Sequence, residues 1–325
     1  MIKKIGILTS GGDAPGMNAC IRSIVRTAFK NNISCIGIEY GYQGILDSKF
    51  RNLGPEDVRN IIHKGGTILK TNRCEEFKKF EYRKKGIKNL KKNNIEGLIV
   101  IGGDGSFIGA SIFSKEFKFP VIGIPATIDN DIYGTDYSVG FSTATRTIIE
   151  SVDKIRDTAS SHERIFFVEV MGKNSGHLAL NAGNATGAEL ILIPEIEMKN
   201  LNILTKSIKK INSKKESLII IYAEGCNLGP IQKITKHVEN KIVGSNVRFS
   251  ILGHIQRGGN PTEKDRIISS LFGYHAVCEL KKNRTHIMIG IQNNQIVNVE
   301  LEESINNDKE INKELINLSS IINNY

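Results

Sequence analysis

The chain has 325 residues, a length that suits about two domains. Its 40% hydrophobic and 24% charged residues are typical of a soluble globular protein. The five cysteines are scattered and include no C-x-x-C pair, which excludes a disulfide framework and predicts reduced thiols. No apolar run reaches transmembrane length, and the opening apolar stretch is too short for a signal-peptide core. We therefore expect a cytoplasmic protein without a membrane partner.

The net charge of +10 raises nucleic acid as a possible partner class. However, the lysines cluster in helix-like stretches, as at 78–79, 84–85 and 91–92, and no nucleic-acid motif accompanies them. We interpret them as solvated faces and expect no nucleic-acid partner. A basic surface would also attract phosphate-bearing substrates.

Strand-like apolar runs alternate with amphipathic segments of helical length along the chain. In chain order the pattern predicts a strand at 5–8, a helix at 17–30, strands at 34–38, 98–101 and 121–124, a helix at 141–158, a strand at 165–170, a helix at 176–186, a strand at 190–193, a helix at 201–211, strands at 218–222 and 247–252, and a helix at 262–280. Near-continuous apolar strands separated by helices favour parallel sheets covered on both faces. We predict an α/β fold of two Rossmann-like lobes with mainly parallel sheets covered by helices, and a site between the lobes.

The first strand is followed by Thr-Ser-Gly-Gly-Asp-Ala-Pro-Gly at 9–16, directly before the first helix. Tandem glycines let backbone N–H groups approach a phosphate at a helix N-terminus. A plain strand–helix turn explains this segment equally well. Neither the G-x-x-x-x-G-K-[ST] element nor a full G-x-G-x-x-G is present, so the usual nucleotide fingerprints fail.

The segment Gly-Gly-Asp-Gly-Ser at 102–106 follows a predicted buried strand. In an open α/β sheet ligands bind at this end of the strands. Because glycines flank Asp104, its carboxylate can meet a hydrated Mg²⁺ carried by nucleotide phosphates. The alternative is that Ser106 simply caps the next helix, but a cap does not explain three glycines around one acid.

The segment Thr-Ile-Asp-Asn-Asp at 127–131 follows the next strand and a proline. On an extended segment Asp129 and Asp131 face the same side. One carboxylate would accept a proton and the other would help to hold a metal, and phosphoryl transfer needs little else beyond positioning. An Asx turn is the alternative.

The segment His-Ile-Gln-Arg-Gly-Gly at 254–259 follows another strand and offers an anion pocket, in which Arg257 would bind a phosphate through two hydrogen bonds. Arg73, Arg164 and Arg248 lie near other polar turns, and each alone is more typical of a surface residue. His162 and His177 are more typical of structural histidines.

As an ordered set, the segments 9–18, 102–106, 125–131, 171–172 and 253–259 resemble bacterial 6-phosphofructokinase from residue 1 to about 297. The resemblance implies the phosphofructokinase fold, a homotetramer with shared active sites, and transfer of the γ-phosphoryl group of MgATP to the 1-hydroxyl of fructose 6-phosphate, the committing step of glycolysis. It assigns a larger ATP-binding lobe to 1–139 plus about 255–305. A smaller fructose-6-phosphate-binding lobe comprises about 140–254 plus 306–325.

The resemblance also implies residue roles. Asp129 is the base, worth about 10²–10⁴ in rate, and Thr127, Arg73 and Asp131 complete the catalytic set. Asp104 holds Mg²⁺, with Asp131 supporting it. The ATP site comprises Gly12, Arg73, Cys74, Gly103, Asp104, Gly105 and Ser106. The substrate site comprises Thr127, Ile128, Asp129, Arg164, Met171, Gly172, Lys173, Glu224, Arg248, His254, Ile255, Gln256 and Arg257, with Arg164 and Arg248 reaching in from a neighbouring subunit.

Two small residues bear on the phosphoryl donor. Pyrophosphate-dependent relatives usually carry aspartate at the position of Gly105 and lysine at that of Ala126. An added carboxylate would repel an ATP α-phosphate, so glycine at 105 favours ATP. A pyrophosphate-dependent enzyme of the same fold stays the first alternative.

The effector site of the family binds ADP as activator and phosphoenolpyruvate as inhibitor, and Arg22, Arg26, Arg156, Glu189 and Lys215 match it. Pro55 and Ser213 replace cations of that site, which predicts a blunted response. At the active site Cys74, Ala126 and Lys173 depart from the family, and Lys173 keeps the charge of an arginine but loses its planar fork.

Two further alternatives are open. Lipid and NAD kinases share the Gly-Gly-Asp-Gly segment but lack the set at 254–257. A non-catalytic nucleotide-binding regulator would not need Asp104, Asp129 and Asp131 together.

Overall fold

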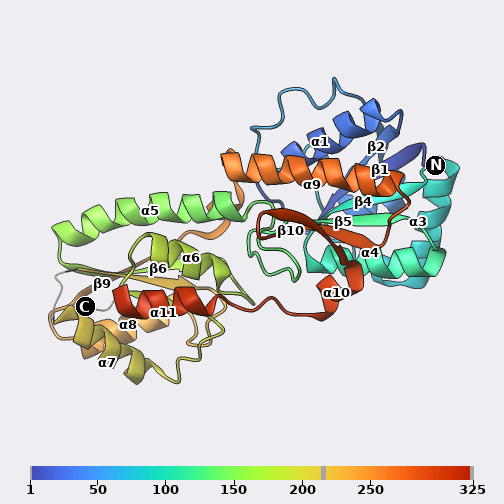
Figure 1. The fold of residues 1–325 in the computed structure, drawn as a ribbon. Helices are drawn as coiled ribbons and strands as arrows, with labels where there is room; N and C mark the ends of the chain where they lie inside the picture. The colour runs from blue at the N-terminus through green and yellow to red at the C-terminus, as the bar shows by residue number, and fades with distance from the viewer. Residues whose placement is uncertain (1, 214–216, 323–325) are drawn as a thin grey trace. The chain divides into compact units, whose positions relative to one another are not determined.

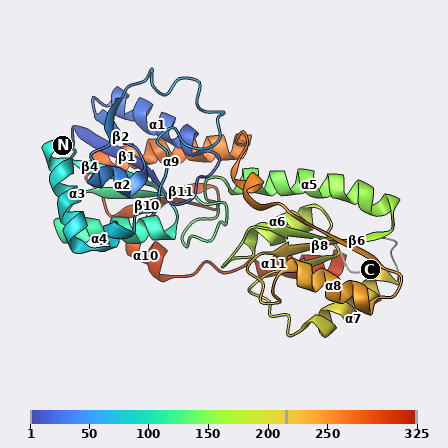
Figure 2. The same cartoon turned by 180° about the vertical axis from the view of Figure 1, so that it is seen from behind.

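The computed structural model describes residues 2–213 and 217–322 and divides the chain into two compact units. Unit 1 comprises residues 1–143 and 257–309, and unit 2 comprises 144–256 and 310–325. Each unit therefore has two chain segments, which Figures 1 and 2 show in the blue-to-green and orange-to-red colours for unit 1. No helix in the described part of the chain has both the length and the hydropathy that a membrane span requires.

Unit 1 is built on a seven-stranded sheet in the order β11-β10-β5-β4-β1-β2-β3. Its strands are β1 (Lys4–Ser10), β2 (Ser34–Ile38), β3 (Phe50–Leu53), β4 (Gly97–Gly102), β5 (Val121–Pro125), β10 (Ile287–Gln292) and β11 (Gln295–Glu300). The pairs joining β2, β1, β4, β5 and β10 are parallel, whereas β3 and β11 run antiparallel at the two edges. Parallel order brings the carboxyl ends of β1, β4 and β5 to one edge.

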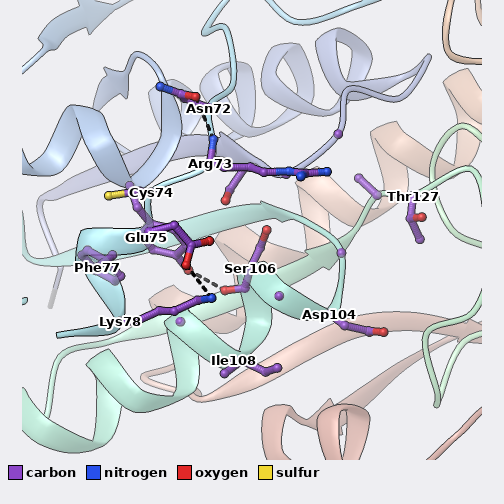
Figure 3. Close-up of a pocket in the computed structure, with 18 of the residues that line it drawn as sticks. Asn72, Arg73, Cys74, Glu75, Phe77, Lys78, Asp104, Ser106, Ile108 and Thr127 are labelled. Carbon is purple, nitrogen blue, oxygen red and sulfur yellow. Dashed lines mark hydrogen bonds and ion pairs between the residues drawn. The ribbon is translucent and has the colours of Figure 1, made fainter. Parts of the chain in front are cut away.

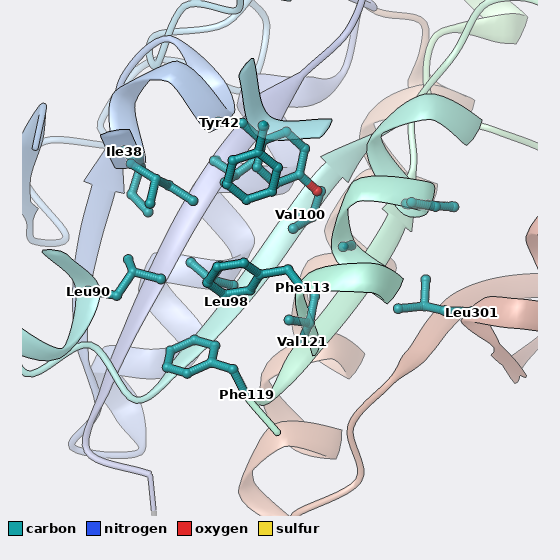
Figure 4. Close-up of a cluster of buried hydrophobic side chains, with 14 of the residues drawn as sticks. Ile38, Tyr42, Leu90, Leu98, Val100, Phe113, Phe119, Val121 and Leu301 are labelled. Atoms are coloured by element: carbon teal, nitrogen blue, oxygen red, sulfur yellow. The ribbon is translucent and has the colours of Figure 1, made fainter. Parts of the chain in front are cut away.

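Helices cover both faces of this sheet. One face carries α1 (Met17–Lys30) and α9 (Glu263–Lys281), which lie side by side in both views of the ribbon. The other face carries α2 (Gly41–Leu46), the 3₁₀ turn η1 (Glu75–Lys78), α3 (Phe80–Lys92), α4 (Asp104–Phe117) and α10 (Leu301–Asn306). Apolar side chains of α2, α3 and α4 pack there on strand residues such as Leu98 and Val100, forming the buried cluster of Figure 4.

Unit 2 has a four-stranded parallel sheet in the order β7-β8-β6-β9. Its strands are β6 (Arg164–Val170), β7 (Leu190–Leu192), β8 (Leu218–Ala223) and β9 (Asn246–Ile251). Its helices are α5 (Phe141–Ser161, whose first turn belongs to unit 1), α6 (His177–Ala185), α7 (Leu201–Asn212), α8 (Ile231–Lys241) and α11 (Lys313–Ile322). Apolar residues of α7 and α8, among them Ile208 and Ile234, pack on Phe167 and Ile220 of the strands.

The predicted α/β class with mainly parallel sheets and covering helices is confirmed. Short turns between the elements place the sequence motifs at the ends of strands. A further short helix, η2 (Gly253–Arg257), follows β9 and ends at the unit boundary.

Candidate active site

One pocket of unit 1, with a cavity volume of about 530 Å³, lies at the carboxyl ends of β1, β4 and β5. Many of the residues predicted for ATP binding and catalysis line it, as Figure 3 shows for several. The predicted residues in its lining are Gly12, Arg73, Cys74, Gly103, Asp104, Gly105, Ser106, Thr127, Asp129 and Arg257.

The turn after β1 and the start of α4 form the glycine-rich wall. Gly11 has a φ of 86°, a left-handed conformation that glycine adopts without strain. The Arg257 side chain packs so closely over Gly12 that a Cβ at this position would lie 1.9 Å from its Nη1. A larger residue at position 12 would therefore displace the arginine from the pocket.

The N-terminus of α4 points its positive dipole end into the pocket region. Gly103 is the N-cap and Asp104 begins the helix, so the capping role considered for Ser106 is wrong. The Tyr42 hydroxyl donates to the Ser106 carbonyl oxygen at 2.5 Å, which fixes this first turn.

Arg73 lies on the segment that joins β3 to η1. The Thr71 hydroxyl donates to the Gly11 carbonyl oxygen at 2.7 Å and ties this segment to the turn after β1. In Figure 3 the Arg73 side chain extends toward Thr127. Arg73 is exposed, so its guanidinium is open to an incoming anion.

The 127–131 segment is a turn rather than the extended segment that the alternation argument assumed. Asn130 adopts a φ of 54°, and its buried amide donates to the Asp136 carbonyl oxygen at 3.0 Å and accepts from the Ser138 N–H at 2.8 Å. The argument that placed Asp129 and Asp131 on one side by alternation was therefore wrong. Asp129 lines the pocket even so, and its N–H donates to the Thr127 hydroxyl oxygen at 3.2 Å.

Acidic groups dominate the electrostatics of this corner. Partial burial, followed by the charges of Asp131, Asp308 and Asp129, raises the pKa of Asp104 to about 6. Burial also raises the pKa of Asp131, although its own N–H and the Lys309 ammonium counteract the shift. Because burial disfavours the charged forms of Asp104 and Asp131, a cation bound beside them would favour their ionisation.

Within residues 2–213 and 217–322, no three His, Cys, Asp or Glu side chains are grouped to hold a metal by themselves. Carboxylate oxygens such as those of Asp104 and Asp131 are the ligand type that a hydrated Mg²⁺ takes in addition to water and nucleotide phosphates.

Unit 2 gathers a second set of predicted residues at the carboxyl edge of its sheet. The Met171 N–H donates to the Gln256 side-chain oxygen at 3.1 Å, and the Gly225 N–H donates to the Gly172 carbonyl oxygen at 3.1 Å. Lys173 and Glu224 are exposed there, as are His254 and Ile255 of η2. Burial and the neighbouring charge of Glu224 raise the pKa of Glu169 at this edge.

Other predicted residues lie elsewhere. Arg164 opens β6 and Arg248 lies within β9, so Arg164 is at the opposite end of the sheet from Met171. Ile128 is buried and does not line the unit 1 pocket.

Of the predicted effector residues, Arg22 and Arg26 lie one turn apart on α1, and Arg156 contacts Glu189 at 3.5 Å. Lys215 lies outside the described residues.

The sequence patterns missed part of the pocket and its surroundings. Its apolar wall includes Tyr42, Phe77, Ile108 and Ile112, of which the last two are exposed one turn apart on α4. This spacing was a usable signal, because two exposed isoleucines on one helix face have no core to enter. Asp308 and Lys309, which act on the carboxylates, had no such signal.

The phosphofructokinase family model matches residues 4–280 of this chain. The ATP-dependent 6-phosphofructokinase of Thermoanaerobacter pseudethanolicus is 49% identical over 99% of this chain and 99% of its own length. The ATP-dependent 6-phosphofructokinase 2 of Bacteroides thetaiotaomicron is 47% identical over 98% of this chain and 97% of its own. The solved phosphofructokinase of Saccharomyces cerevisiae has a TM-score of 0.86 and 35% identity, covering 94% of this chain and 45% of that one. These similarities, over the whole span of motifs from the turn after β1 to α9, show that the chain belongs to the phosphofructokinase family.

Proposed function

We propose that this chain transfers the γ-phosphoryl group of MgATP to the 1-hydroxyl of fructose 6-phosphate, giving fructose 1,6-bisphosphate and ADP, the committing step of glycolysis. The observation that carries the proposal is the pocket of unit 1, where a glycine-rich wall, an exposed arginine and the carboxylates of Asp104 and Asp129 come together. The names of the full-length relatives support the same activity.

The glycine-rich wall accounts for binding of the triphosphate. The turn at Gly11 and Gly12 and the first turn of α4 present backbone to the phosphates, with the helix dipole adding attraction for negative charge. Arg73 neutralises charge that develops on the transferred group. The side chains of Ile108 and Ile112 offer an apolar surface of the kind that a purine ring packs against.

Asp129 activates the acceptor. Its carboxylate accepts the proton of the sugar hydroxyl as the new P–O bond forms, a step worth about 10²–10⁴ in rate. Thr127 lies beside it and accepts a hydrogen bond from its N–H, which fixes the turn that presents the base. Recognition of the sugar phosphate by unit 2 would use Met171, Gly172, Lys173, Glu224, His254, Ile255 and Gln256, with Arg164 and Arg248 supplied by neighbouring subunits. Arg257, which lines the unit 1 pocket, has the chemistry to bind a phosphate.

Asp104 would hold the Mg²⁺ that accompanies ATP, with Asp131 in support. When bound, this ion would offset negative charge on the phosphates during transfer. The raised pKa of Asp104 supports this role, because a cation would offset both the burial of the carboxylate and the repulsion from its acidic neighbours that raise it.

ATP is the proposed donor because of Gly105. A Cβ added at Gly105 would meet no heavy atom within 4 Å, so a longer side chain there would extend into open space at the pocket wall. An aspartate in this place would repel the α-phosphate of ATP, whereas pyrophosphate has no such group. Ala126 likewise supplies no lysine for pyrophosphate.

We also propose a cytoplasmic homotetramer regulated weakly by ADP and phosphoenolpyruvate, whose site would include Arg22, Arg26, Arg156, Glu189 and Lys215. All five cysteines, each within the described residues, are unpaired, in keeping with a reducing compartment. A sigmoidal fructose 6-phosphate curve that ADP relieves fully would contradict weak regulation.

The proposed function is tested by steady-state assay of the purified chain with ATP or pyrophosphate as donor. We expect turnover with ATP to exceed turnover with pyrophosphate, and D129N to lose about 10²-fold or more in kcat while still binding both substrates. The E81Q variant, which changes an exposed residue of α3 outside the pocket lining, serves as the control. Faster turnover with pyrophosphate than with ATP would overturn the assignment of ATP as the donor. An active D129N enzyme would overturn the assignment of Asp129 as the base.

A further inference from the structure

The residues that leave α10 lie against the loop that carries Asp129 and Asp131. Asp308 forms an antiparallel bridge with Ile132. The neighbouring Lys309 donates from its Nζ to the Asp136 carbonyl oxygen at 3.0 Å. The 129–136 loop is therefore contacted by a segment about 170 residues further along the chain, at the end of unit 1.

Asp136 anchors the 129–136 loop through hydrogen bonds of its backbone and its side chain. Its carbonyl oxygen accepts from the Asn130 amide and from the Lys309 ammonium, both at 3.0 Å. Its own N–H donates to the Ile291 carbonyl oxygen at 2.7 Å, and its carboxylate accepts from the Asn293 N–H at 2.8 Å. The loop is thus tied to the β10–β11 hairpin on one side and to Lys309 on the other.

Lys309 also supplies positive charge to an acidic corner. The carboxylates of Asp136 and Asp131 both attract its ammonium electrostatically. The same corner holds Asp104, whose carboxylate is repelled by Asp131, Asp308 and Asp129. Although burial lowers the pKa of Lys309 to about 8, the charged form predominates at neutral pH.

We propose that Lys309 is a positioning residue for phosphoryl transfer, which holds the 129–136 loop through the Asp136 carbonyl and offsets the charge of Asp131. Its Nζ bonds to the protein backbone, so it acts through the loop and not on the substrate. The inference rests on the proposed roles of Asp129 and Asp131. Loss of the ammonium leaves the Asp136 carbonyl with one donor fewer and Asp131 with its repulsion uncompensated, and both effects shift the turn that carries the base.

The test compares K309Q, K309R and D131N with the control K313Q, which removes a nearby exposed lysine paired only locally with Glu310. The measurements are kcat, the KM values for fructose 6-phosphate and ATP, the Mg²⁺ concentration for half-maximal rate, and the unfolding temperature. We expect K309Q to lose about 10- to 100-fold in kcat, since small misplacements of reacting groups have effects of this size. It should also need less Mg²⁺, because the acidic corner then carries more uncompensated negative charge and attracts a cation more strongly, with little change in the KM for fructose 6-phosphate or in the unfolding temperature. K309R should recover most of the rate, and K313Q should match the wild-type chain.

Three outcomes would overturn the inference. If K309Q keeps its kcat and Mg²⁺ dependence within about twofold while D131N loses turnover, Lys309 has no positioning role and the proposed function stands. If K309Q and K309R lose activity in parallel with a lower unfolding temperature, the lysine serves only the fold. If D131N itself retains full turnover, the proposed role of Asp131 fails and the inference fails with it.

Discussion

Gly105 lies in the first turn of α4, where a side chain would project into open space at the pocket wall. We expect G105D to lower kcat/KM for ATP by about 10- to 100-fold, because a carboxylate there repels the nucleotide phosphates. The KM for fructose 6-phosphate should change little. Steady-state kinetics with varied ATP check this, with G105S as the matched neutral control. Equal kinetics for G105D and G105S would show that charge at 105 does not select the donor.

Asp308 contributes to the ionisation behaviour of Asp104 from outside the motifs. Its charge is among those that, after burial, raise the Asp104 pKa to about 6. Replacing Asp308 with asparagine removes one repulsion, so Asp104 should ionise at lower pH. Activity that needs ionised Asp104 falls as the pH drops through this pKa, and in D308N we expect that acid limb to lie at lower pH.

Profiles of kcat/KM for ATP against pH report this shift, because they follow the ionisation of the free enzyme. E310Q, which removes a nearby exposed carboxylate paired with Lys313, is the control and should leave the limb in place. A limb that stays fixed or moves to higher pH in D308N would contradict the expectation.

At the scale of single residues, sequence patterns predicted which positions line the pocket better than they predicted the backbone conformation there. Glycines beside Asp104 and the proline before Thr127 are local signals, so the pocket-lining positions could be predicted. The conformation of the 127–131 segment could not, because the left-handed Asn130 is stabilised by Asp136 and Ser138 further along the loop. Lys309 was missed since nothing near it in the sequence marks a contact with that loop.

Among the elements, the β10–β11 hairpin has a turn of well-defined chemistry. Asn293 and Asn294 have φ values of 49° and 60°, the left-handed pair of a type I′ turn. A β-branched residue is strained in this conformation, so N294V should lower the free energy of unfolding by about 1–2 kcal/mol. Chemical denaturation measures the loss, and N294G should be close to neutral. An unchanged midpoint in N294V would mean that the turn relaxes to another type.

The strands that sequence patterns predicted differ physically from the strands that they missed. The central parallel strands are continuous apolar runs because both of their faces are buried. Their positions in the sequence could therefore be predicted. The edge strands β3 and β11 contain several exposed residues and pair antiparallel, so they lack a continuous apolar run and carry a weaker signal. The buried strand β10 was missed as well, although the turn Asn293-Asn294 that joins it to β11 was a usable hairpin signal for both strands.

For the whole molecule, β9 is the feature that bears on assembly. It is an edge strand of the unit 2 sheet, yet Phe249 and Ile251 are 41% and 48% exposed, and Ile255 of η2 is 57% exposed. Exposed apolar edge strands favour association. We expect this edge to be covered in the proposed homotetramer, and the variant carrying F249E and I251E to form smaller species.

Light scattering coupled to size-exclusion chromatography measures the mass. V243E is the control, because Val243 is a lone, 98% exposed apolar residue in the same unit. A monomeric wild-type chain, or an unchanged mass in the double variant, would contradict the expectation.

Sequence alone identified the family through several motifs together. Association depends on which side chains remain exposed after folding, and no local sequence pattern predicts that.

The pairing of β10 with β5 has a consequence for the order of events during synthesis. The central sheet of unit 1 stays incomplete until residues 287–300 have emerged, whereas the strands of unit 2 all lie between residues 164 and 251. Domains generally form as their chain becomes available. We therefore expect unit 2 to form its sheet first. Until β10 has been synthesised, the hydrophobic edge of unit 1 at β5 stays unpaired and needs protection from aggregation.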